Sequence, residues 1–352
     1  MRMTFSLRRS LTALATLGLM VTALAQTTVP PQPQGTVRVM TYNIQWFHQG
    51  DGLERIKNLK EVMADIRPNV LGFQETQSRA AIMQILDDTW NVGIINDTDE
   101  PQKLGIAVKA PYKLVDWEML FTSPALNFAF PGKRDVLRAT VETPQGLRMT
   151  VYVLHQKSRS GGRRQTDAQR EMAAGILAGY IAARGDNNAV VMGDMNDAPN
   201  DRSLNILESG DVMAKGGPRG EYRLLANLTE ELAEKDHVTI GMEDLYNGGP
   251  AISTIVPGAK AENDRLRGLD YRFPQDVKIT QTFMDQILTS PHMLVAGNKA
   301  HVYGGVAAMR GLRGRVSVGE DPNTGTRTVE YTEKGTLASD HLPVFADVTL
   351  RR

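Results

Sequence analysis

The sequence predicts a layered α/β fold, in which β-sheets pack against helices around one large core. The first observation is that strand-like and helix-like patterns alternate after residue 37 and then give way mainly to strands. The second is that several apolar segments of strand length end directly in Asn, Glu, His or Asp. The third is that no long linker divides the body of the chain, which favours one domain over two.

The first part of the domain reads as strand, helix, strand, helix. Residues 37–42 (VRVMTY) alternate in the manner of a half-buried strand. Apolar residues recur at helical spacing from Leu53 to Ile66, and Pro68 ends that helix. A short apolar strand at 70–73 ends at Gln74-Glu75, and a second helix is predicted over 80–86.

Strands predominate from residue 104 onward. We expect strands at 105–108, 112–120, 136–142 and 147–155, with a hairpin turn at 144–146, and a helix at 165–183. The apolar strand that begins at Val190 stops at Gly193 and presents Asp194 and Asn196, which would face the same way if the extended conformation continued. The remaining predictions are short helices and loops over 203–247, a strand at 280–289, a hairpin or surface excursion in the Gly-rich segment 296–336, and a last strand at 344–350.

The N-terminus has the order of a secretory signal peptide. Basic residues are followed by an apolar run from Leu11 to Ala25 and a small-x-small site at its end, so residues 1–25 are the predicted signal. The run is shorter than the roughly 20 residues of a transmembrane helix. We therefore expect export to the periplasm or the medium. Residues 26–36 are expected to form a flexible leader before the domain, which spans 37–352.

Composition excludes some kinds of binding and stabilisation. The chain has 40 basic and 40 acidic residues, and removal of the signal peptide leaves a net charge of about −3. It is therefore no polycation that binds nucleic acid by bulk charge, and an anionic substrate must be held by local arginines or a metal ion. The absence of Cys excludes disulfides and thiolate metal sites. Stability must come from a core, which a chain of about 330 residues readily supplies.

Polar groups at strand ends are the candidate functional residues. Five of them follow apolar strands directly, one lies within or at the edge of a strand, and two precede the last strand. We expect them to converge at one edge of stacked sheets, as residues of a site do. Each alone could instead be a turn former, a helix cap or a surface histidine. The residues are Asn43, Glu75, His155, Asp194, Asn196, Asp285, Asp340 and His341.

The chemistry of these groups favours a hard cation. Four of them are carboxylates, which suit Mg²⁺, with Mn²⁺ or Ca²⁺ as alternatives, better than structural zinc. A phosphodiester would be repelled by carboxylates unless a cation bridged them. The two histidines suit proton transfer or stabilisation of a phosphate in its pentavalent state. The basic run 157–164 (KSRSGGRR) is expected to be a solvated loop, as charge runs usually are, or a local source of positive charge.

Seven short blocks, taken in order, resemble the endonuclease/exonuclease/phosphatase family. This is the fold of deoxyribonuclease I, exonuclease III-type repair enzymes, neutral sphingomyelinases and inositol-polyphosphate phosphatases. The resemblance covers residues 37–350 and fits an exported, bacterial-type member. GDMN or SDH alone would be weak, but their order makes the resemblance specific. The blocks are TYN (41–43), GFQET (72–76), RDV (134–136), HQKS (155–158), GDMN (193–196), MDQIL (284–288) and SDHLPV (339–344).

The resemblance implies a four-layer sandwich of two packed mixed β-sheets flanked by helices, with the site at one edge. It also implies metal ligation by Glu75, with Asn43 and Asp340 close to the ion. Arg134 matches the family's phosphate-contacting arginine, and Arg138 is a rival for that role.

The remaining implied roles concern the reaction. Asp194 would orient or deprotonate the attacking water, and Asn196 would hold the scissile phosphate. His341, paired with Asp285, and His155 would act on the phosphoryl oxygens or the leaving group.

Two departures from the family pattern surround His155. The family commonly has Asn two residues before this histidine, where the chain has Val153. Deoxyribonuclease-type members have an acidic partner for the histidine where this chain has Gln102-Lys103. His155 is therefore expected either to lack a carboxylate partner or to recruit Asp99 or Glu100.

The leading functional hypothesis is an exported, divalent-metal-dependent phosphodiesterase, most simply a nuclease that hydrolyses DNA or RNA by in-line attack of an activated water. The second is a hydrolase of lipid or inositol phosphates, which an exposed aromatic loop would favour; the 296–336 segment has only Tyr303 and Tyr331 as aromatics. The third is a non-catalytic binding protein. No obligate protein partner is expected.

Overall fold

Two packed sheets form the body of the molecule. The computed structural model describes residues 29–95, 100–159, 163–217, 223–235, 237, 239–240, 283–295, 298–304, 316–320, 327–331 and 338–352. Within them, the first sheet has, in spatial order, β11 (Ala300–Val302), β14 (Val344–Val348), β1 (Val37–Phe47), β2 (Val70–Thr76), β4 (Lys103–Lys109) and β3 (Trp90–Ile94). The second has β5 (Lys113–Leu120), β6 (Val136–Glu142), β7 (Arg148–His155), β8 (Ala189–Asp194), β10 (Asp285–Thr289) and β9 (Ala226–Asn227).

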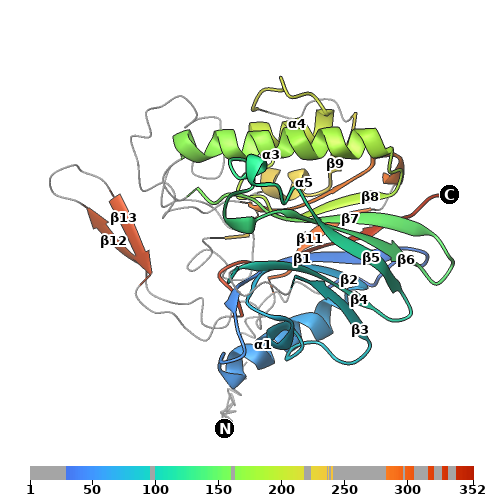
Figure 1. Cartoon of the computed structure of the whole chain (residues 1–352). Coiled ribbons are helices and arrows are strands. Elements are labelled where there is room, and N and C mark those ends of the chain that lie inside the picture. Colours follow the sequence, from blue (N-terminus) through green and yellow to red (C-terminus); the bar gives the residue numbers. More distant parts are fainter. Residues whose placement is uncertain are drawn as a thin grey trace, which may run out of the picture.

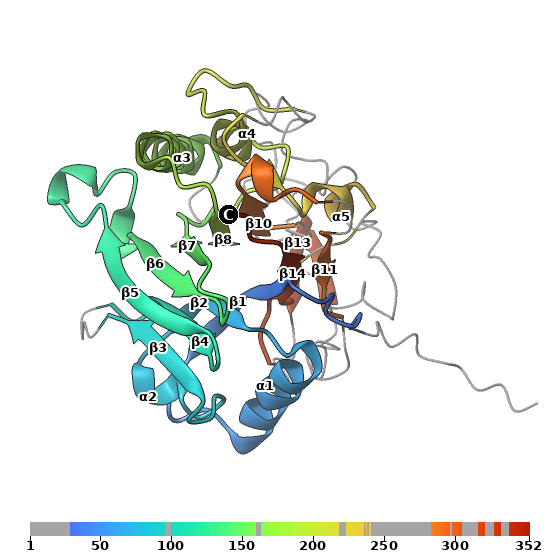
Figure 2. The same cartoon turned by 90° about the vertical axis from the view of Figure 1, so that its right-hand side faces the viewer.

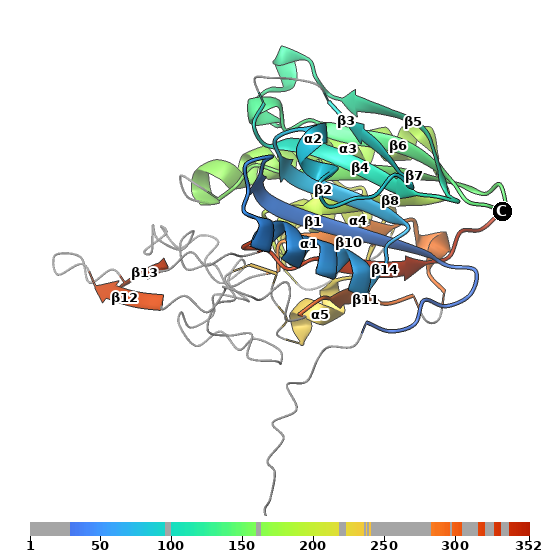
Figure 3. The ribbon, with the colours of Figure 1, turned by 90° about the horizontal axis from the view of Figure 1, so that it is seen from below.

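Helices cover the outer faces of both sheets. α1 (Leu53–Ile66) lies against the first sheet, whereas α3 (Arg163–Arg184) and α4 (Arg202–Ser209) lie against the second (Figure 1). A view turned by 90° keeps α1 and the α3–α4 pair on opposite sides of the sheets (Figure 2), and from below α1 lies in front of the first sheet (Figure 3). The predicted four-layer sandwich of two mixed sheets is confirmed. Two short helices, α2 (Arg79–Ile82) and α5 (Glu230–Glu234), complete the set in the described part of the chain.

The inner faces of the sheets approach closely at Gly72. A Cβ atom added there would lie 2.7 Å from the Met192 side chain and 3.0 Å from that of Val153. Glycine on β2 therefore admits the bulky residues of β7 and β8. Val153, one of the departures noted above, is fully buried at this contact. A second core lies between the second sheet and α3–α4, where Leu177 and Leu204 are buried.

Most predicted elements are confirmed, and the errors have local causes. The helix at 53–66 and the strand at 136–142 have the predicted ends. The helix predicted over 80–86 is wrong beyond α2, because the chain turns after residue 82 and packs Ile85 and Leu86 into the core. β3 was missed. The strand predicted at 280–289 begins at Asp285, and residues 280–282 lie outside the described residues.

The Gly-rich segment contains the predicted hairpin. β12 (Val316–Glu320) and β13 (Arg327–Tyr331) form an antiparallel pair of their own. The same segment also supplies β11, which joins the first sheet beside β14 and was not predicted. Most of the rest of 296–336 lies outside the described residues.

The described chain begins at residue 29, within the predicted leader. Val29 packs against the core, Pro30 O accepts a 2.8 Å hydrogen bond from Arg38, and the Gln32 amide donates to Asn69 Oδ1 at 2.8 Å. Residues 1–28, which include the predicted signal peptide, lie outside the described residues. Among the helices that are described, none has the length and apolar character needed to cross a membrane.

Candidate active site

Strand register brings three predicted site residues side by side. β7 runs parallel to β8 with His155 opposite Asp194, and β10 runs antiparallel to β8 with Asp285 opposite Asp194. Gly193 makes the close pairing possible, since a Cβ atom there would lie 2.0 Å from the Leu154 carbonyl oxygen. Its φ of +154° is also one that other residues rarely adopt. His155, Asp194 and Asp285 therefore lie side by side at one end of the second sheet.

Asn43 connects this row to the first sheet. Its Nδ2 atom donates to Glu75 Oε1 and to Asp194 Oδ2, each at 3.1 Å. Glu75 has a φ of +59°, and the pairing of β1 with β2 shifts register between Asn43 and Phe47. A bulge of this kind redirects a side chain at the end of a strand. Carboxylates from both sheets therefore share one amide.

The loop before β14 delivers His341 and Asp340. His341 Nδ1 lies 2.8 Å from Asp285 Oδ2, as the family resemblance implied. Ser339 holds the loop, because its hydroxyl donates to Asn43 O at 2.6 Å and accepts from His341 N at 3.1 Å. Asp340 is buried and close enough to Glu75 for that carboxylate to add to the effect of burial, which raises the pKa of Asp340. Ser339 stands in one of the seven blocks, but no role was predicted for it.

Asp194 and Asn196 meet through a turn and not through strand alternation. Asn196 has a φ of +50°, so the extended conformation ends before it, and the condition under which strand alternation would place the two side chains on one side is not met. The Asn196 backbone N–H donates to Asp194 Oδ1 at 2.9 Å, and its side-chain amide donates to Oδ2 at 3.2 Å. An aspartate that accepts a hydrogen bond from the backbone two residues on closes a turn. These two hydrogen bonds hold the side chains of Asp194 and Asn196 together.

Arg134, and not its rival Arg138, reaches the cluster. Arg134 Nη1 lies 3.3 Å from His155 Nε2 and donates to Gln156 O at 3.2 Å. Gln102 Oε1 accepts from Arg134 Nη2 at 2.7 Å and so orients the guanidinium. Arg138 instead bonds Glu118 at 2.7 Å on the exposed side of β5. In the sequence, Gln102 was recorded only because deoxyribonuclease-type members have an acidic residue there. In the structure it accepts a hydrogen bond from Arg134, the candidate for contact with a phosphate.

His155 finds its nearest carboxylates within the cluster itself. Its Nε2 atom lies 3.5 Å from Glu75 Oε1 and 3.7 Å from Asp194 Oδ2. Glu100, one of the predicted partners, accepts from Gln102 N instead. Asp99, the other, lies outside the described residues.

Burial strongly perturbs the titrating groups. It raises the pKa of Asp194 to about 7, an effect that Asp285 adds to and His341 opposes. Burial also raises the pKa of Asp340. For His341, burial lowers the pKa, but the carboxylates of Asp285, Asp194 and Asp340 outweigh it and the pKa lies well above its usual value. For His155, burial and the positive charge of Arg134 hold the pKa well below its usual value.

The donor set fits a hard divalent cation. Ligand atoms of Asp194, Asp285 and His341, all buried, lie within 4.8 Å of one another. Of the predicted ligands, Asn43 and Glu75 are joined by a hydrogen bond at the same edge, and Asp340 follows Ser339, whose hydroxyl donates to Asn43 O. Buried carboxylates of like charge are unfavourable without a compensating cation, and oxygen ligands are those that Mg²⁺, Mn²⁺ and Ca²⁺ prefer.

Two arginines of the basic run after β7 are buried and not solvated. Arg159 and Arg163 are 1% and 0% exposed, and both guanidinium groups pair with the Asp201 carboxylate. For these two arginines the expectation of solvation is therefore wrong, because buried aspartates from the chain after β8 attract their side chains inward. The same contacts remove both arginines from the charge available to a substrate.

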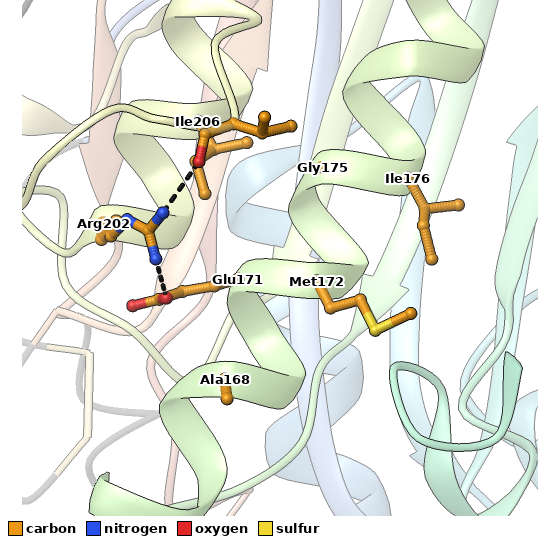
Figure 4. A pocket seen from close by; sticks show the side chains of 8 residues that line it. Ala168, Glu171, Met172, Gly175, Ile176, Arg202 and Ile206 are labelled. Carbon is orange, nitrogen blue, oxygen red and sulfur yellow. Dashed lines mark hydrogen bonds and ion pairs between the residues drawn. The ribbon is translucent and has the colours of Figure 1, made fainter.

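A cavity of about 430 Å³ between α3 and α4 lies apart from this chemistry (Figure 4). It is lined by Met172, Gly175 and Ile206, with the Arg202–Glu171 ion pair at one side. None of the predicted site residues lines it. Its walls belong to the outer helical layer, so the polar cluster at the sheet edge remains the candidate active site.

Solved structures share the fold over nearly the whole chain. TDP2 from D. rerio, humanised by 14 mutations, has a TM-score of 0.52 at 13% identity and covers 90% of this chain and 100% of its own. D. rerio TDP2 with a single-strand DNA product gives 0.52 at 14% identity, covering 90% and 99%. The mannosyl-6-phosphatase of Bacteroides thetaiotaomicron gives 0.54 at 13% identity, covering 89% and 100%. At these identities the likeness concerns the fold alone.

Family membership is shown by comparison of sequences and not by the shared fold. No curated protein matches the chain. The sequence pattern described as "Endonuclease/Exonuclease/phosphatase family" matches residues 40–341, which is most of the chain and includes every site residue discussed above. The chain therefore belongs to the endonuclease/exonuclease/phosphatase family.

Proposed function

We propose that this family member is an exported, divalent-metal-dependent phosphodiesterase that hydrolyses nucleic acid. One observation carries the proposal: Asp194 accepts hydrogen bonds from both Asn43 and Asn196 and faces His155 and the Asp285–His341 pair across neighbouring strands. This arrangement gathers a base, two amide groups and a histidine whose pKa is raised at one edge of the sheets. A bound divalent cation supplies positive charge that offsets the charge of the phosphate.

The side chains of the site transfer protons and contact the phosphoryl group. Asp194, whose pKa burial raises to about 7, accepts a proton from the attacking water near neutral pH. The Asn196 side-chain amide, which in the free site donates to Asp194 Oδ2 and to Gln156 O, exchanges one of these bonds for a phosphoryl oxygen, from a position set by its own turn. His341, kept protonated by Asp285, donates to the phosphoryl group or the leaving oxygen. Arg134 approaches the same oxygens from the side of β6, and its positive charge adds to the burial that lowers the pKa of His155.

Nucleic acid is the first substrate candidate because a structural relative, D. rerio TDP2, is seen with a single-strand DNA product. A phosphate monoester of a sugar is the second. It is favoured by the similarity to a mannosyl-6-phosphatase and by the burial of Arg159 and Arg163, which leaves Arg134 and part-exposed Lys157 as the described cations of that region. A long polyanion ordinarily needs a broader basic surface.

The deciding experiment is a substrate panel for purified residues 26–352 with Mg²⁺, Mn²⁺ or Ca²⁺. The panel holds single- and double-stranded DNA, RNA, mannose 6-phosphate, and vesicles containing sphingomyelin or a phosphoinositide. We expect chelator-sensitive cleavage of nucleic acid that Asp194→Ala abolishes and the exposed control Asp116→Ala leaves intact. Preferential release of phosphate from the sugar ester would promote the second candidate, and lipid cleavage alone would replace both. Tight binding with no hydrolysis of any substrate would favour the non-catalytic alternative.

Export rests on residues 1–25 alone and has its own test. The full chain, produced in a Gram-negative host, should be found outside the cytoplasm with its first residues removed. Mass spectrometry of that protein should give an N-terminus at Gln26. Recovery of the unprocessed chain from the cytoplasm would remove export from the proposal without affecting the chemistry.

A further inference from the structure

Three buried arginines lie directly behind the candidate active site. Arg159 follows β7, and Arg163 and Arg170 come from the first turns of α3; none is more than 1% exposed. Guanidinium groups cannot shed their charge by deprotonation, so their burial requires compensating carboxylates. Those carboxylates are Asp167, Asp197 and Asp201, which contact the arginines as ion pairs.

Arg159 acts on the backbone of Asn196. Its Nε atom donates to Asn196 O at 2.9 Å, while its Nη2 atom lies 3.2 Å from Asp201 Oδ2. Asn196 has the left-handed φ of +50°, a conformation that persists where its surroundings hold it. A charged donor on the carbonyl oxygen supplies such a restraint. The turn that aims the Asn196 amide is therefore held from behind by a guanidinium group.

Arg170 joins the segments that follow β7 and β8. Its Nε atom lies 2.8 Å from Asp197 Oδ1, and its Nη1 atom donates to Lys157 O at 2.8 Å. The second oxygen of Asp197 accepts from Ser203 at 2.6 Å. For the Asp197 carboxyl, burial raises the pKa, but Arg170, Arg163 and Arg159 outweigh it and the pKa lies below its usual value. One arginine thus fixes the spacing of two loops that carry site residues.

Arg163 forms an ion pair with the residue directly before α4. Its Nη2 atom lies 2.6 Å from Asp201 Oδ1. Asp201 is the residue that precedes α4, and its Oδ2 atom accepts from Ala198 N at 2.8 Å. The turn between Asn196 and Asp201 is consequently tied at both ends to side chains from the opposite loop and from α3.

We propose that Arg159 and Arg170 are positioning residues of the reaction, which set the conformation of Asn196 and the separation of the two loops without touching the substrate. The inference rests on the proposed function for its kinetic part, since it assigns these arginines to the same site. It also explains a feature of the sequence, because two arginines of the basic run at 157–164, Arg159 and Arg163, are buried behind the site.

The test replaces each arginine by lysine, which keeps the positive charge and loses the forked donor geometry. Arg38→Lys is the matched control, because Arg38 is 1% exposed and pairs with Asp347 through 2.8 and 2.7 Å hydrogen bonds at the opposite end of β1. Activity is measured with Mn²⁺ on bis(p-nitrophenyl) phosphate, per folded molecule. We expect Arg159→Lys and Arg170→Lys to lower kcat by about 10- to 100-fold with KM little changed, as small misplacements of reacting groups do. Arg38→Lys should lower the melting temperature comparably and leave kcat within about twofold.

A second readout is independent of catalysis. In protein labelled with ¹⁵N-asparagine, the side-chain amide resonance of Asn196 should shift in Arg159→Lys and stay in place in Arg38→Lys. Wild-type kcat in both site variants, an equal loss of kcat in Arg38→Lys, or an unmoved Asn196 resonance would each overturn the positioning role. A wild-type protein that hydrolyses no phosphoester would refute the proposed function instead, and the resonance would then decide the inference alone.

Discussion

Asp285 Oδ2 lies 2.8 Å from His341 Nδ1, and both side chains are buried. The contact joins β10 to the loop before β14, two segments from different sheets. It commits Nδ1 to the carboxylate and leaves Nε2 toward Asp194, whose Oδ2 atom is 3.9 Å away. A carboxylate in this place both orients an imidazole and stabilises its protonated form. The electrostatic state of His341 therefore depends on Asp285.

The first prediction concerns this pair. Asp285→Asn keeps the shape of the side chain but removes the charge that raises the pKa of His341. We expect kcat to fall by on the order of 10²- to 10⁴-fold, the range for a misplaced or wrongly protonated acid. Activity that needs protonated His341 is lost as the pH rises through its pKa, so the alkaline limb of the pH–kcat profile should move to lower pH. An unchanged limb would show that another group is the acid; Asp116→Asn is the exposed control.

The second prediction links pH, stability and metal. Because the folded pKa of Asp194 is raised to about 7, its contribution to stability is complete below its unfolded pKa and is lost as the pH rises through the folded value. The raised pKa of His341 acts in the same direction above 6.5. His155, whose pKa is lowered, acts oppositely below 6.5. In chelator the melting temperature should therefore fall between pH 6.5 and about 8.

Excess Mg²⁺ should reverse that fall, and Asp194→Asn should flatten it, because the cation or the amide removes the cost of a buried carboxylate. Thermal denaturation across the pH series, with and without chelator, measures both effects. A melting temperature that rises over this interval in chelator would contradict the assignment of Asp194 as a desolvated carboxyl.

The third prediction compares the effects on KM of Arg134, which precedes β6, and Arg138, which lies in β6. Arg134→Ala should raise KM for a phosphoester about 10-fold or more, since Arg134 reaches His155 and the cluster. Arg138→Ala, which removes a partner of Glu118 on the exposed side, should change KM by less than about twofold. Gln102→Leu should give an intermediate KM, because Arg134 stays but loses its 2.7 Å acceptor. Equal effects of the two alanine variants on KM would return Arg138 to the site.

The fourth prediction tests the close pairing of β7 and β8. Gly193→Ala introduces a Cβ atom 2.0 Å from Leu154 O, so the strands must separate. We expect a loss of about 1–3 kcal/mol or more in the free energy of unfolding, together with a loss of activity. Gly179→Ala is the control, since nothing lies within 4 Å of its Cβ position in α3 and the helix should gain about 0.5–1 kcal/mol. Urea denaturation of both variants compares them; similar stabilities would mean that the β7–β8 edge tolerates expansion.

Periodicity determined much of the fold at the level of sequence. The helix at 53–66 and the strand at 136–142 were predicted with their observed ends. Both have a periodic pattern of apolar residues that can be recognised from neighbouring positions alone. The polar endings of the strands likewise predicted a shared edge, and Asn43, Glu75, Asp194 and the pair of Asp285 with His341 do meet there.

Contacts between distant segments decided the rest. The charge run at 157–164 has the local pattern of a solvated loop, and only partners such as Asp201, about 40 residues further along, make burial of Arg159 favourable. The same holds for the choice of Arg134 over Arg138, which depends on Gln102, the residue directly before β4 of the other sheet. Residue types and local spacing determined which chemical groups the chain carries. The packing of two sheets determined which charged groups line the candidate site and which lie buried behind it.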